Sequence, residues 1–424
     1  MELLIQNGRV VDAASGLDDV MDILVSEGRI CAIGKDLQAE QARVIDAKGL
    51  IVAAGLVDMH VHLREPGQEY KETIATGCAA AARGGVTTLA CMPNTKPAID
   101  TPECIAQVLG KASACGVQVL PIGAVTVGQK GGALTDFAAL KQAGAVALSD
   151  DGVPVQNANL VRNALMQAKD LELTILSHCE DAEMVCNYAV NEGEVSRKLG
   201  LPGRPAIAEE LMVMRDAMLA EETGAAVHIC HVSTGRSVDI VRQFKQKGVA
   251  ITCETCPQYF TLTEEEVLKQ GTMARINPPL RTPHDVEEII RGLQDGTIDA
   301  IATDHAPHSA EEKAKPLPEA PSGAVGLETS LAVTLTALYH TGKMELAEIL
   351  RRMTINPAKI LRTDAGQLAV GNRADFVIFD PDEEWVVDPE QFVSKGRNTP
   401  FKGYPVKGKV KYTVSNGTII YQEG

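Results

Sequence analysis

The sequence predicts an α/β protein in which a (β/α)8 TIM-like barrel, roughly residues 53–364, adjoins a small composite β-sheet domain formed by both chain ends, 1–52 and 365–424. Three observations predict this architecture. Eight short apolar runs alternate with helical patterns, as in parallel barrels. Apolar residues make up 45% of the chain and aromatic residues only 4%, so the core must consist mainly of Ala, Val, Ile and Leu. Both chain ends show short alternating strands instead.

The eight expected barrel strands are the apolar runs themselves. They are GLVDMHVHL (55–63), TTLACMPN (87–94), VQVLPIGAV (117–125), AVALSDDG (145–152), LTILSHCE (173–180), AVHICHVS (226–233), VAITCETC (249–256) and IDAIATDHAPH (298–308). The intervening segments, such as 72–85, 102–116 and 206–224, are Ala-rich or amphipathic, and several end in Gly before the next strand. A doubly wound open sheet is the alternative, but no Gly-rich phosphate loop follows the first strand, which favours the barrel.

The two chain ends carry a different pattern. Residues 1–52 contain LLIQNGRVVD, DILVSEGRICAIG and ARVIDAKGLIV, and residues 366–424 contain ADFVIFDPDEEWVV and KGKVKYTVSNGTIIYQ. Short alternating strands with Gly or Asn turns predict a small β unit. In the simplest arrangement both ends pair in one β domain beside the barrel.

The charge of the chain limits its partners. Asp and Glu number 56 against 40 Lys and Arg, a net charge of −16. Nucleic acids and anionic membranes require a basic field, so we expect neither as a partner, whereas a small anionic substrate needs only one positive pocket. The N-terminus shows no signal peptide, and no apolar stretch reaches the ~18 residues of a membrane span. We therefore expect a cytoplasmic protein.

The ten cysteines are scattered along the chain, which fits reduced thiols better than a disulfide framework. One CxxC occurs, from Cys253 to Cys256. Alone it is weak evidence for zinc or redox chemistry, and we interpret it as two ordinary thiols near a strand end.

The first apolar run ends in polar residues at every second position: His60, His62 and Arg64. Residues i, i+2 and i+4 of a strand share one face, so all three should point the same way at the carboxyl end of the strand. Barrel enzymes place their chemistry at that end. Two histidines so spaced can hold one metal ion, although a pair of hydrogen-bonded core histidines explains this motif alone equally well.

The ends of the other strands favour the metal site over a pair of hydrogen-bonded core histidines. Asp150 and Asp151 end the fourth run, and the remaining polar residues at strand ends are His178, His231, Asp304, His305 and His308. His228 precedes His231 by three residues and should be buried on the other face. Four histidines and two aspartates that converge on one barrel mouth predict a binuclear metal site, with zinc favoured.

The sequence also resembles a known family. DMHVHLREPG, MPNT, SDDG, SHCED, HVST, NPPLR, TDHAPH and SGAVGLETS are similar to motifs of the cyclic amidohydrolases, most closely the dihydroorotases of the bacterial type. The resemblance covers nearly the whole chain and implies an amidohydrolase barrel with a composite β domain. One branch of that family uses an aspartate where many relatives carry a carboxylated lysine, and this chain has no lysine at the end of its fourth run.

Carried over by position, the resemblance implies two zinc ions per chain, bridged by Asp151 and a hydroxide. It makes His60, His62 and Asp304 ligands of one ion, and it makes His178 and His231 ligands of the other. Asp150 should point to the opposite face. Because aspartate is shorter than carboxylated lysine, the second site should be the weaker one.

The implied reaction is the reversible cyclisation of N-carbamoyl-L-aspartate to L-dihydroorotate and water, the third step of pyrimidine (UMP) biosynthesis. Asp304 would bind one metal and shuttle the proton. The fork of Arg64 suits the substrate carboxylate, and the resemblance adds Asn94 and His308 there and places Asn277 against the ring. As alternatives, Asn94 is a turn former and Asn277 a loop residue.

Two rival functions remain open at this stage. Hydantoinases, dihydropyrimidinases and allantoinases share the metal motifs, but their substrates need not carry a ring carboxylate, so Arg64 favours dihydroorotase. A non-catalytic scaffold usually loses metal ligands, and this chain keeps them all. We expect a homo-oligomer, and docking to aspartate transcarbamoylase is neither indicated nor excluded by the sequence.

Overall fold

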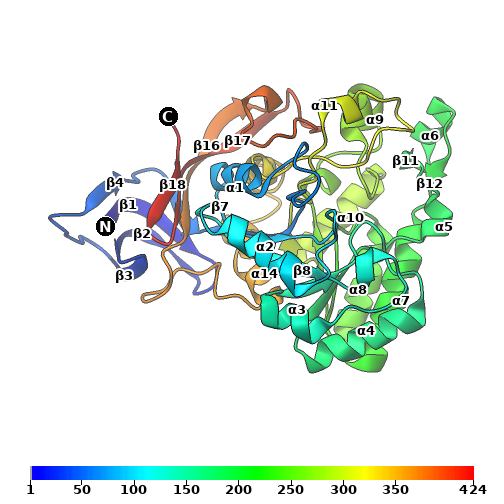
Figure 1. Cartoon of the computed structure of the whole chain (residues 1–424). Helices are drawn as coiled ribbons and strands as arrows, with labels where there is room; N and C mark the ends of the chain where they lie inside the picture. The colour runs from blue at the N-terminus through cyan, green and yellow to red at the C-terminus, as the bar shows by residue number, and fades with distance from the viewer. Residues whose placement is uncertain (1) are drawn as a thin grey trace.

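The computed structural model describes residues 2–424 and has two parts, a barrel and a β-sheet domain (Figure 1). Within these residues the barrel sheet has eight parallel strands in the order β15-β14-β13-β10-β9-β8-β7-β6. They are β6 (Leu56–Val61), β7 (Val86–Cys91), β8 (Gln118–Ala124), β9 (Ala147–Ser149), β10 (Thr174–Ser177), β13 (Val227–Ile229), β14 (Ile251–Thr255) and β15 (Ala300–Ile301). Each predicted run contains one strand. A parallel bridge between Val61 and His305 joins the first strand to the segment after the last, which confirms the barrel and excludes the open sheet.

Helices alternate with these strands and cover the barrel. The main ones are α1 (Ile74–Arg83), α2 (Pro102–Ala112), α3 (Phe137–Ala143), α4 (Ala158–Asp170), α7 (Ile207–Thr223), α8 (Gly235–Gln246), α10 (Pro283–Gln294), α12 (Ser330–Thr334), α13 (Leu346–Met353) and α14 (Ile355–Ile360). Their ends follow the capping rules: Thr73 and Thr282 form capping boxes, and Gly144 and Gly224 end α3 and α7 in the left-handed conformation. The connections contain α5 (Ala182–Val185), α6 (Glu194–Leu199), α9 (Glu266–Gln270), α11 (Ala310–Lys313), β11 (Val190–Asn191) and β12 (Gly203–Arg204).

Both chain ends form the second sheet, as predicted. Its strands are β1 (Leu3–Asp12), β2 (Leu17–Ser26), β3 (Arg29–Gly34), β4 (Arg43–Asp46), β5 (Ile51–Ala54), β16 (Phe376–Val386), β17 (Pro405–Ser415) and β18 (Thr418–Gln422). The order is β18-β17-β16-β5-β1-β2-β3, and β4 pairs with β1. The two ends meet where β5 runs antiparallel to β16, so blue and orange segments share one sheet in Figure 1.

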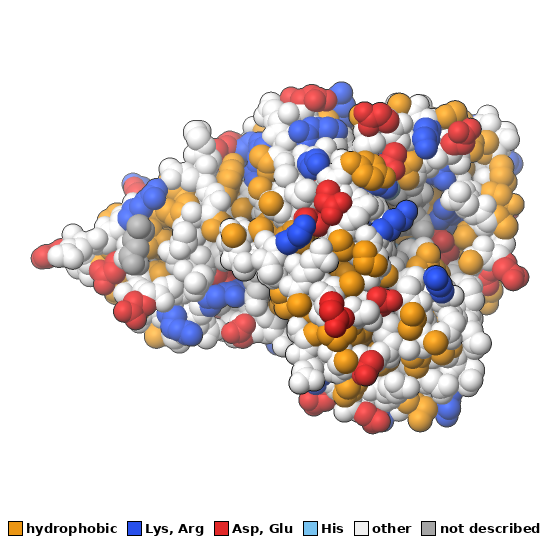
Figure 2. Space-filling model, in the orientation of Figure 1, with side chains coloured by type: hydrophobic (Ala, Val, Ile, Leu, Met, Phe, Trp, Pro, Cys, Tyr) orange, Lys and Arg blue, Asp and Glu red, His pale blue; other side chains and the backbone are white. Residues whose placement is uncertain are grey.

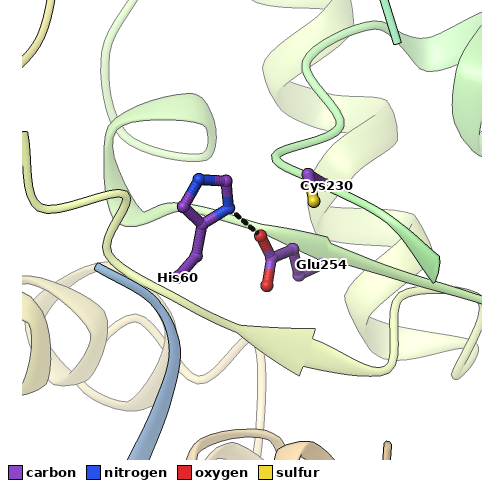
Figure 3. A group of neighbouring side chains, drawn as sticks. All are labelled: His60, Cys230 and Glu254. Atoms are coloured by element: carbon purple, nitrogen blue, oxygen red, sulfur yellow. Dashed lines mark hydrogen bonds and ion pairs between the residues drawn. The ribbon is translucent and has the colours of Figure 1, made fainter. Parts of the chain in front are cut away.

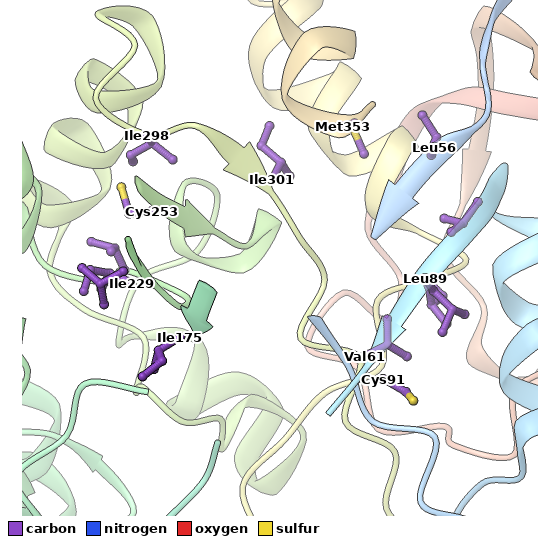
Figure 4. Close-up of a cluster of buried hydrophobic side chains, with 14 of the residues drawn as sticks. Leu56, Val61, Leu89, Cys91, Ile175, Ile229, Cys253, Ile298, Ile301 and Met353 are labelled. Atoms are coloured by element: carbon purple, nitrogen blue, oxygen red, sulfur yellow. The ribbon is translucent and has the colours of Figure 1, made fainter. Parts of the chain in front are cut away.

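Two hydrophobic layers fix the barrel strands. Side chains such as Leu89, Ile175 and Ile301 belong to a large buried cluster that also includes residues of the surrounding helices (Figure 4). Their chain neighbours Ala90, Leu176 and Ala300 belong to a separate cluster. This alternation follows from the two faces of a strand, and it turns the polar side chains at the strand ends toward the barrel mouth.

Two observations bear on the wider sequence expectations. All ten cysteines are free, so the described residues contain no disulfide. Across residues 2–424 we find no helix with the length and apolar character that a membrane crossing requires.

The packing of α1 gives a test of the fold. An alanine Cβ at Gly84 would lie 1.9 Å from the carbonyl oxygen of Leu327, whereas one at Gly110 in α2 would meet nothing within 4 Å. Gly84→Ala should therefore lower the free energy of unfolding by about 1–3 kcal/mol, and Gly110→Ala should raise it by about 0.5–1 kcal/mol. Urea unfolding of both variants measures the difference, and equal effects would contradict this packing.

Candidate metal centre

The six predicted ligands meet at the carboxyl ends of the barrel strands. His60 lies in β6 and His62 just beyond it, and the other four follow β9, β10, β13 and β15: Asp151, His178, His231 and Asp304. All six side chains are buried. Parallel strands bring their carboxyl ends to one rim, so residues from distant parts of the sequence become neighbours there.

His60, His62 and the two carboxylates form a first group. Nε2 of His62 lies 3.0 Å from Oδ1 of Asp304 and 3.4 Å from Oδ2 of Asp151. Nε2 of His60 lies 3.4 Å from Oδ1 of Asp151 and 3.5 Å from Oδ1 of Asp304. Both imidazoles thus face both carboxylates.

Asp151 also belongs to a second group. Its Oδ1 lies 3.4 Å from Nδ1 of His178 and 3.6 Å from Nε2 of His231, and these two ring nitrogens are 2.7 Å apart. In each set, His60–His62–Asp151 and Asp151–His178–His231, all ligand atoms lie within 4.8 Å of one another. Asp151 is therefore the shared member of two sites that can each hold a metal ion.

The donor atoms fit divalent cations. Nε2 of His60 and Oδ1 of Asp151 are buried and have no hydrogen-bond partner, although buried polar atoms rarely stay unpaired. Imidazole nitrogens and carboxylate oxygens are the ligands of zinc and related ions in catalytic sites. A cation bound between these residues would satisfy both unpaired atoms.

Electrostatics couples the two groups through Asp151. Burial alone would raise the pKa of this carboxyl, but the charge of His60 and the nearby imidazoles of His178 and His231 hold the pKa well below its usual value. Burial opposes protonation of His178, yet Asp151 and Glu180 raise its pKa to about 10. Asp151 and Glu254 likewise raise the pKa of His60 well above its ordinary value, against the effect of burial. Without a cation, the imidazoles neutralise the aspartate.

Three polar residues close to the candidate ligands do not belong to either ligand group. Asp150 turns away, as predicted: its carboxylate accepts the backbone N–H groups of Val125 and Thr126. His305 also turns away, and its Nε2 lies 3.3 Å from the buried carboxylate of Glu72. His228 is fully buried, as expected.

A pocket of about 200 Å³ opens beside the ligands. Its lining residues are His62, Arg64, Asn94, Asp151, Gly152, His178, His231, Asn277, Asp304, Ala306, His308, Ser322 and Gly323. The structure therefore brings all four residues predicted for substrate binding to the same cavity. Arg64 reaches it from beyond the strand, because β6 ends at Val61 and Arg64 has a left-handed backbone with φ 59°.

The predicted substrate residues have contacts that the sequence did not indicate. The amide oxygen of Asn94 lies 2.8 Å from Nδ1 of His62, so Asn94 can accept a hydrogen bond from the N–H of this candidate metal ligand. Nε2 of His308 can donate to the carbonyl of Ser322 at 2.8 Å, and burial and nearby cations hold the pKa of His308 far below its ordinary value. Asn277 accepts a hydrogen bond from Arg204, and its Nδ2 lies 3.4 Å from Nε2 of His178.

Sequence reasoning missed two acidic neighbours of the ligands. Glu254 lies 2.6 Å from Nδ1 of His60, and Glu180 lies 3.9 Å from Nε2 of His178 and 2.9 Å from Arg204. The available signal for Glu254 was a single acidic residue inside the apolar run VAITCETC. The flanking Cys253 and Cys256 are fully buried, and neither belongs to a metal-competent group within residues 2–424.

A parallel (β/α)8 barrel with imidazoles and carboxylates gathered at its mouth defines a metal-dependent amidohydrolase. Two family models agree: Dihydro-orotase-like matches residues 49–237, and Amidohydrolase family matches residues 316–421. Among solved structures, the L-hydantoinase (dihydropyrimidinase) from Arthrobacter aurescens is similar with a TM-score of 0.89 and 26% identity, over 100% of this chain and 96% of that one. A D-hydantoinase at 24% identity, with a TM-score of 0.88 over 100% of this chain and 95% of that one, shows the same fold.

Curated relatives give the particular family. Dihydroorotases from Syntrophus aciditrophicus (strain SB) and Geobacter sp. (strain M21) are 48% and 50% identical, each over 100% of both chains. The dihydroorotase from Lactococcus lactis subsp. lactis (strain IL1403) is 48% identical over the same full coverage. This chain belongs to the dihydroorotase family, which confirms the resemblance found in the sequence.

The second group of ligands can be tested by removing one imidazole. His178→Ala should remove the weaker metal and most activity, because it takes a nitrogen from a set that holds only two histidines and the shared Asp151. Metal analysis and an activity assay measure both effects. Full metal content and full activity in this variant would contradict the binuclear assignment.

Metal affinity should increase with pH. His60 and His178 have raised pKa values, about 10 for His178, so both bind protons near neutral pH and must release them to ligate a cation. The cost of releasing these protons falls as the pH rises toward about 10. Competition titrations with a chelator at several pH values measure the slope, corrected for protonation of the chelator. An affinity independent of pH would contradict the protonation of these two imidazoles near neutral pH.

Proposed function

We propose that this chain is a zinc-dependent dihydroorotase that catalyses the reversible cyclisation of N-carbamoyl-L-aspartate to L-dihydroorotate and water, in pyrimidine (UMP) biosynthesis. One observation carries the choice of substrate. Arg64 is buried in the pocket beside the metal ligands, and no carboxylate within residues 2–424 forms an ion pair with it. A buried cation without a carboxylate partner favours an anionic ligand.

The proposed cofactor is a pair of zinc ions. His60, His62 and Asp304 would hold one ion, His178 and His231 would hold the other, and Asp151 would bridge both. When bound, such ions activate water and polarise a carbonyl group. The orphaned nitrogen of His60 and oxygen of Asp151 support this assignment. The short side chain of Asp151 is our reason to expect unequal affinities.

Asp304 is the proposed proton carrier. It lines the pocket and lies 3.0 Å from His62, so its carboxylate contacts both a candidate ligand and the space for substrate. In ring opening it would accept a proton from the attacking water and pass it to the leaving ring nitrogen. In ring closure it would donate a proton to the departing hydroxyl.

Arg64 is the proposed anchor of the substrate carboxylate. Its Nε donates to the carbonyl of Pro307 at 3.2 Å, which orients the guanidinium and leaves its other N–H groups for the ligand. Asn94, whose oxygen faces His62, would contribute its amide N–H. His308 lies 3.5 Å from Arg64 and Asn277 lies beside His178, and we keep both as substrate contacts.

The hydantoinase alternative concerns the same chemistry on a ring without this carboxylate. Sequence identity is near 50% to dihydroorotases and 26% to the L-hydantoinase, which supports the first assignment. Assays with dihydroorotate, dihydrouracil and hydantoin separate the two. Faster turnover of an uncharged ring than of dihydroorotate would refute the proposal.

We also propose a homo-oligomer, and we keep aspartate transcarbamoylase as a candidate partner. Large apolar side chains are exposed on neighbouring helices, namely Met166 on α4 and Leu211 and Met218 on α7. Such side chains favour association with another surface. On the face drawn in Figure 2, basic side chains are scattered among acidic ones and form no continuous basic patch. Light scattering of the chain, alone and with aspartate transcarbamoylase, tests both.

Arg64→Met should keep the metals and lose binding of carboxylate-bearing substrate. Loss of a buried charged hydrogen bond costs ~2–5 kcal/mol when its partner stays charged. Steady-state kinetics and metal analysis measure the two effects. Arg162→Met, which changes an arginine paired with Glu222 on the surface, is the control and should behave like wild type. Unchanged dihydroorotate kinetics in Arg64→Met would remove the anchor assignment.

The two directions of the reaction should have opposite pH dependences. Hydrolysis of dihydroorotate needs Asp304 as a proton acceptor and should rise with pH, whereas cyclisation needs it as a donor and should fall, through an apparent ionisation of the assembled site. Initial rates in each direction separate this effect from the shift of the equilibrium. Parallel profiles would show that another group carries the proton.

Asp304→Asn provides the matching variant. It should depress both directions by orders of magnitude, because an amide cannot carry the proton. Since Asp304 is also a proposed ligand, metal content must be measured in the same preparation. Near-normal rates in a fully metallated variant would exclude Asp304 as the carrier.

A further inference from the structure

A buried carboxylate beneath the metal centre is not used by the proposed mechanism. Glu254 lies in β14, between the two cysteines of the CxxC motif, and it is fully buried. Its Oε1 lies 2.6 Å from Nδ1 of His60. Figure 3 shows this nitrogen turned to the carboxylate, while the other ring nitrogen points away from it. That second nitrogen, Nε2, is the one that faces Asp151 at 3.4 Å.

The other oxygen of Glu254 faces a second histidine. Oε2 lies 3.4 Å from Nε2 of His228, and Nδ1 of His228 lies 2.8 Å from the hydroxyl of Thr252. His60, His228 and Glu254 all have no exposed surface. The carboxylate thus lies between imidazoles from β6 and β13. Nδ1 of His60 is hydrogen-bonded to it, whereas Nε2 of His228 and Oε2 of Glu254 face each other without a hydrogen bond. This arrangement compensates a charge that would otherwise be costly to bury.

The same residues raise the question of a separate metal site. Ligand atoms of His60, Cys230 and Glu254 lie within 4.8 Å of one another (Figure 3). However, Nδ1 of His60 already takes part in a 2.6 Å hydrogen bond with Glu254, and Nε2 of the same ring is the nitrogen that faces Asp151 in the proposed centre. The group fits a hydrogen-bonded support better than a third site.

We propose that Glu254 is a positioning residue of the metal centre. It accepts a hydrogen bond from the N–H at Nδ1 of His60. The lone pair at Nε2 then faces the first ligand group, and the carboxylate makes this nitrogen a stronger electron-pair donor to a metal ion. A carboxylate behind a ligating histidine acts in this way in metal sites generally. Nδ1 of His62 faces the neutral amide oxygen of Asn94 instead of a carboxylate. The two histidines of the first ligand group therefore differ in the charge of the residue that accepts their Nδ1–H. This inference rests on the proposed zinc centre.

The test uses two changes at one position. Glu254→Gln keeps an acceptor for His60 but loses the charge, and Glu254→Ala loses both. Zinc affinity is measured by competition with a chelator, and zinc content by metal analysis of the full chain. We expect one of the two zinc ions to bind about 10–100-fold more weakly, with the larger loss in Glu254→Ala. Thermal unfolding of the metal-stripped proteins reports any general loss of stability.

Glu72→Gln is the matched control. Glu72 is also fully buried and pairs with a histidine, His305, which lies outside the ligand set. The Glu72→Gln variant should bind both zinc ions as the wild type does, even if its metal-free form is less stable. Wild-type affinity in Glu254→Gln and Glu254→Ala, or an equal loss in Glu72→Gln, overturns the proposal.

The remaining outcomes are also decisive. If Glu254→Ala does not fold, the titration of Glu254→Gln alone decides. If the wild-type chain binds no zinc, the proposed metal centre fails and this inference fails with it. If the wild type binds two ions and the Glu254 variants match it, only the positioning role fails.

Discussion

The carboxylate of Asp151 is the point on which the rest of the site depends. A fully buried charge is stable only with close compensation, and four imidazoles from three strand ends lie within 3.6 Å of it. The same carboxylate belongs to both groups of candidate ligands. Asp151 thus links the imidazoles of both groups into one cluster of five side chains.

The barrel supplies this convergence at little cost to its own packing. Inner and outer hydrophobic layers fix most of the strands, and the candidate ligands lie at or just beyond the strand ends. Partners outside the ligand set then fix the rings: Asn94 faces Nδ1 of His62, and Glu254 faces Nδ1 of His60. The chemistry at the mouth therefore depends on side chains one layer below it as well as on the ligands themselves.

Most of the fold, and the gathering of the candidate ligands at the barrel mouth, could be predicted from the sequence because both follow from the pattern of residues along the chain. An apolar run followed by His or Asp is visible locally, as at His178 or Asp304. Contacts between strands are not visible in this way. The pairing of Glu254 with His60 joins positions far apart in the sequence, so a lone acidic residue in an apolar run was its only trace. The sequence argument for Arg64 reached the correct pocket by a wrong route, since the strand ends before it.

The backbone at the mouth is held in conformations that ordinary residues avoid. Arg64, His231 and Asp304 have φ values of 59°, 34° and 47°. Left-handed backbone at a non-glycine residue costs of order 1–3 kcal/mol, and it persists only where the surrounding structure imposes it. Glycine would relieve this strain at each position but would delete the functional side chain, so the site is maintained against the local preference of the chain.

The shared sheet also constrains the order of events during synthesis. β5 pairs with β16, and Ala54 faces Phe376, roughly 300 residues later in the chain. At a ribosomal rate of about 5–20 residues per second, the first strands wait for tens of seconds before their partners exist. During that time Ile5, Val10 and Ile23, which the finished domain buries completely, have no complete core to enter. The barrel can form in the meantime, so we expect the amino-terminal segment to be the part of the nascent chain that most needs a chaperone.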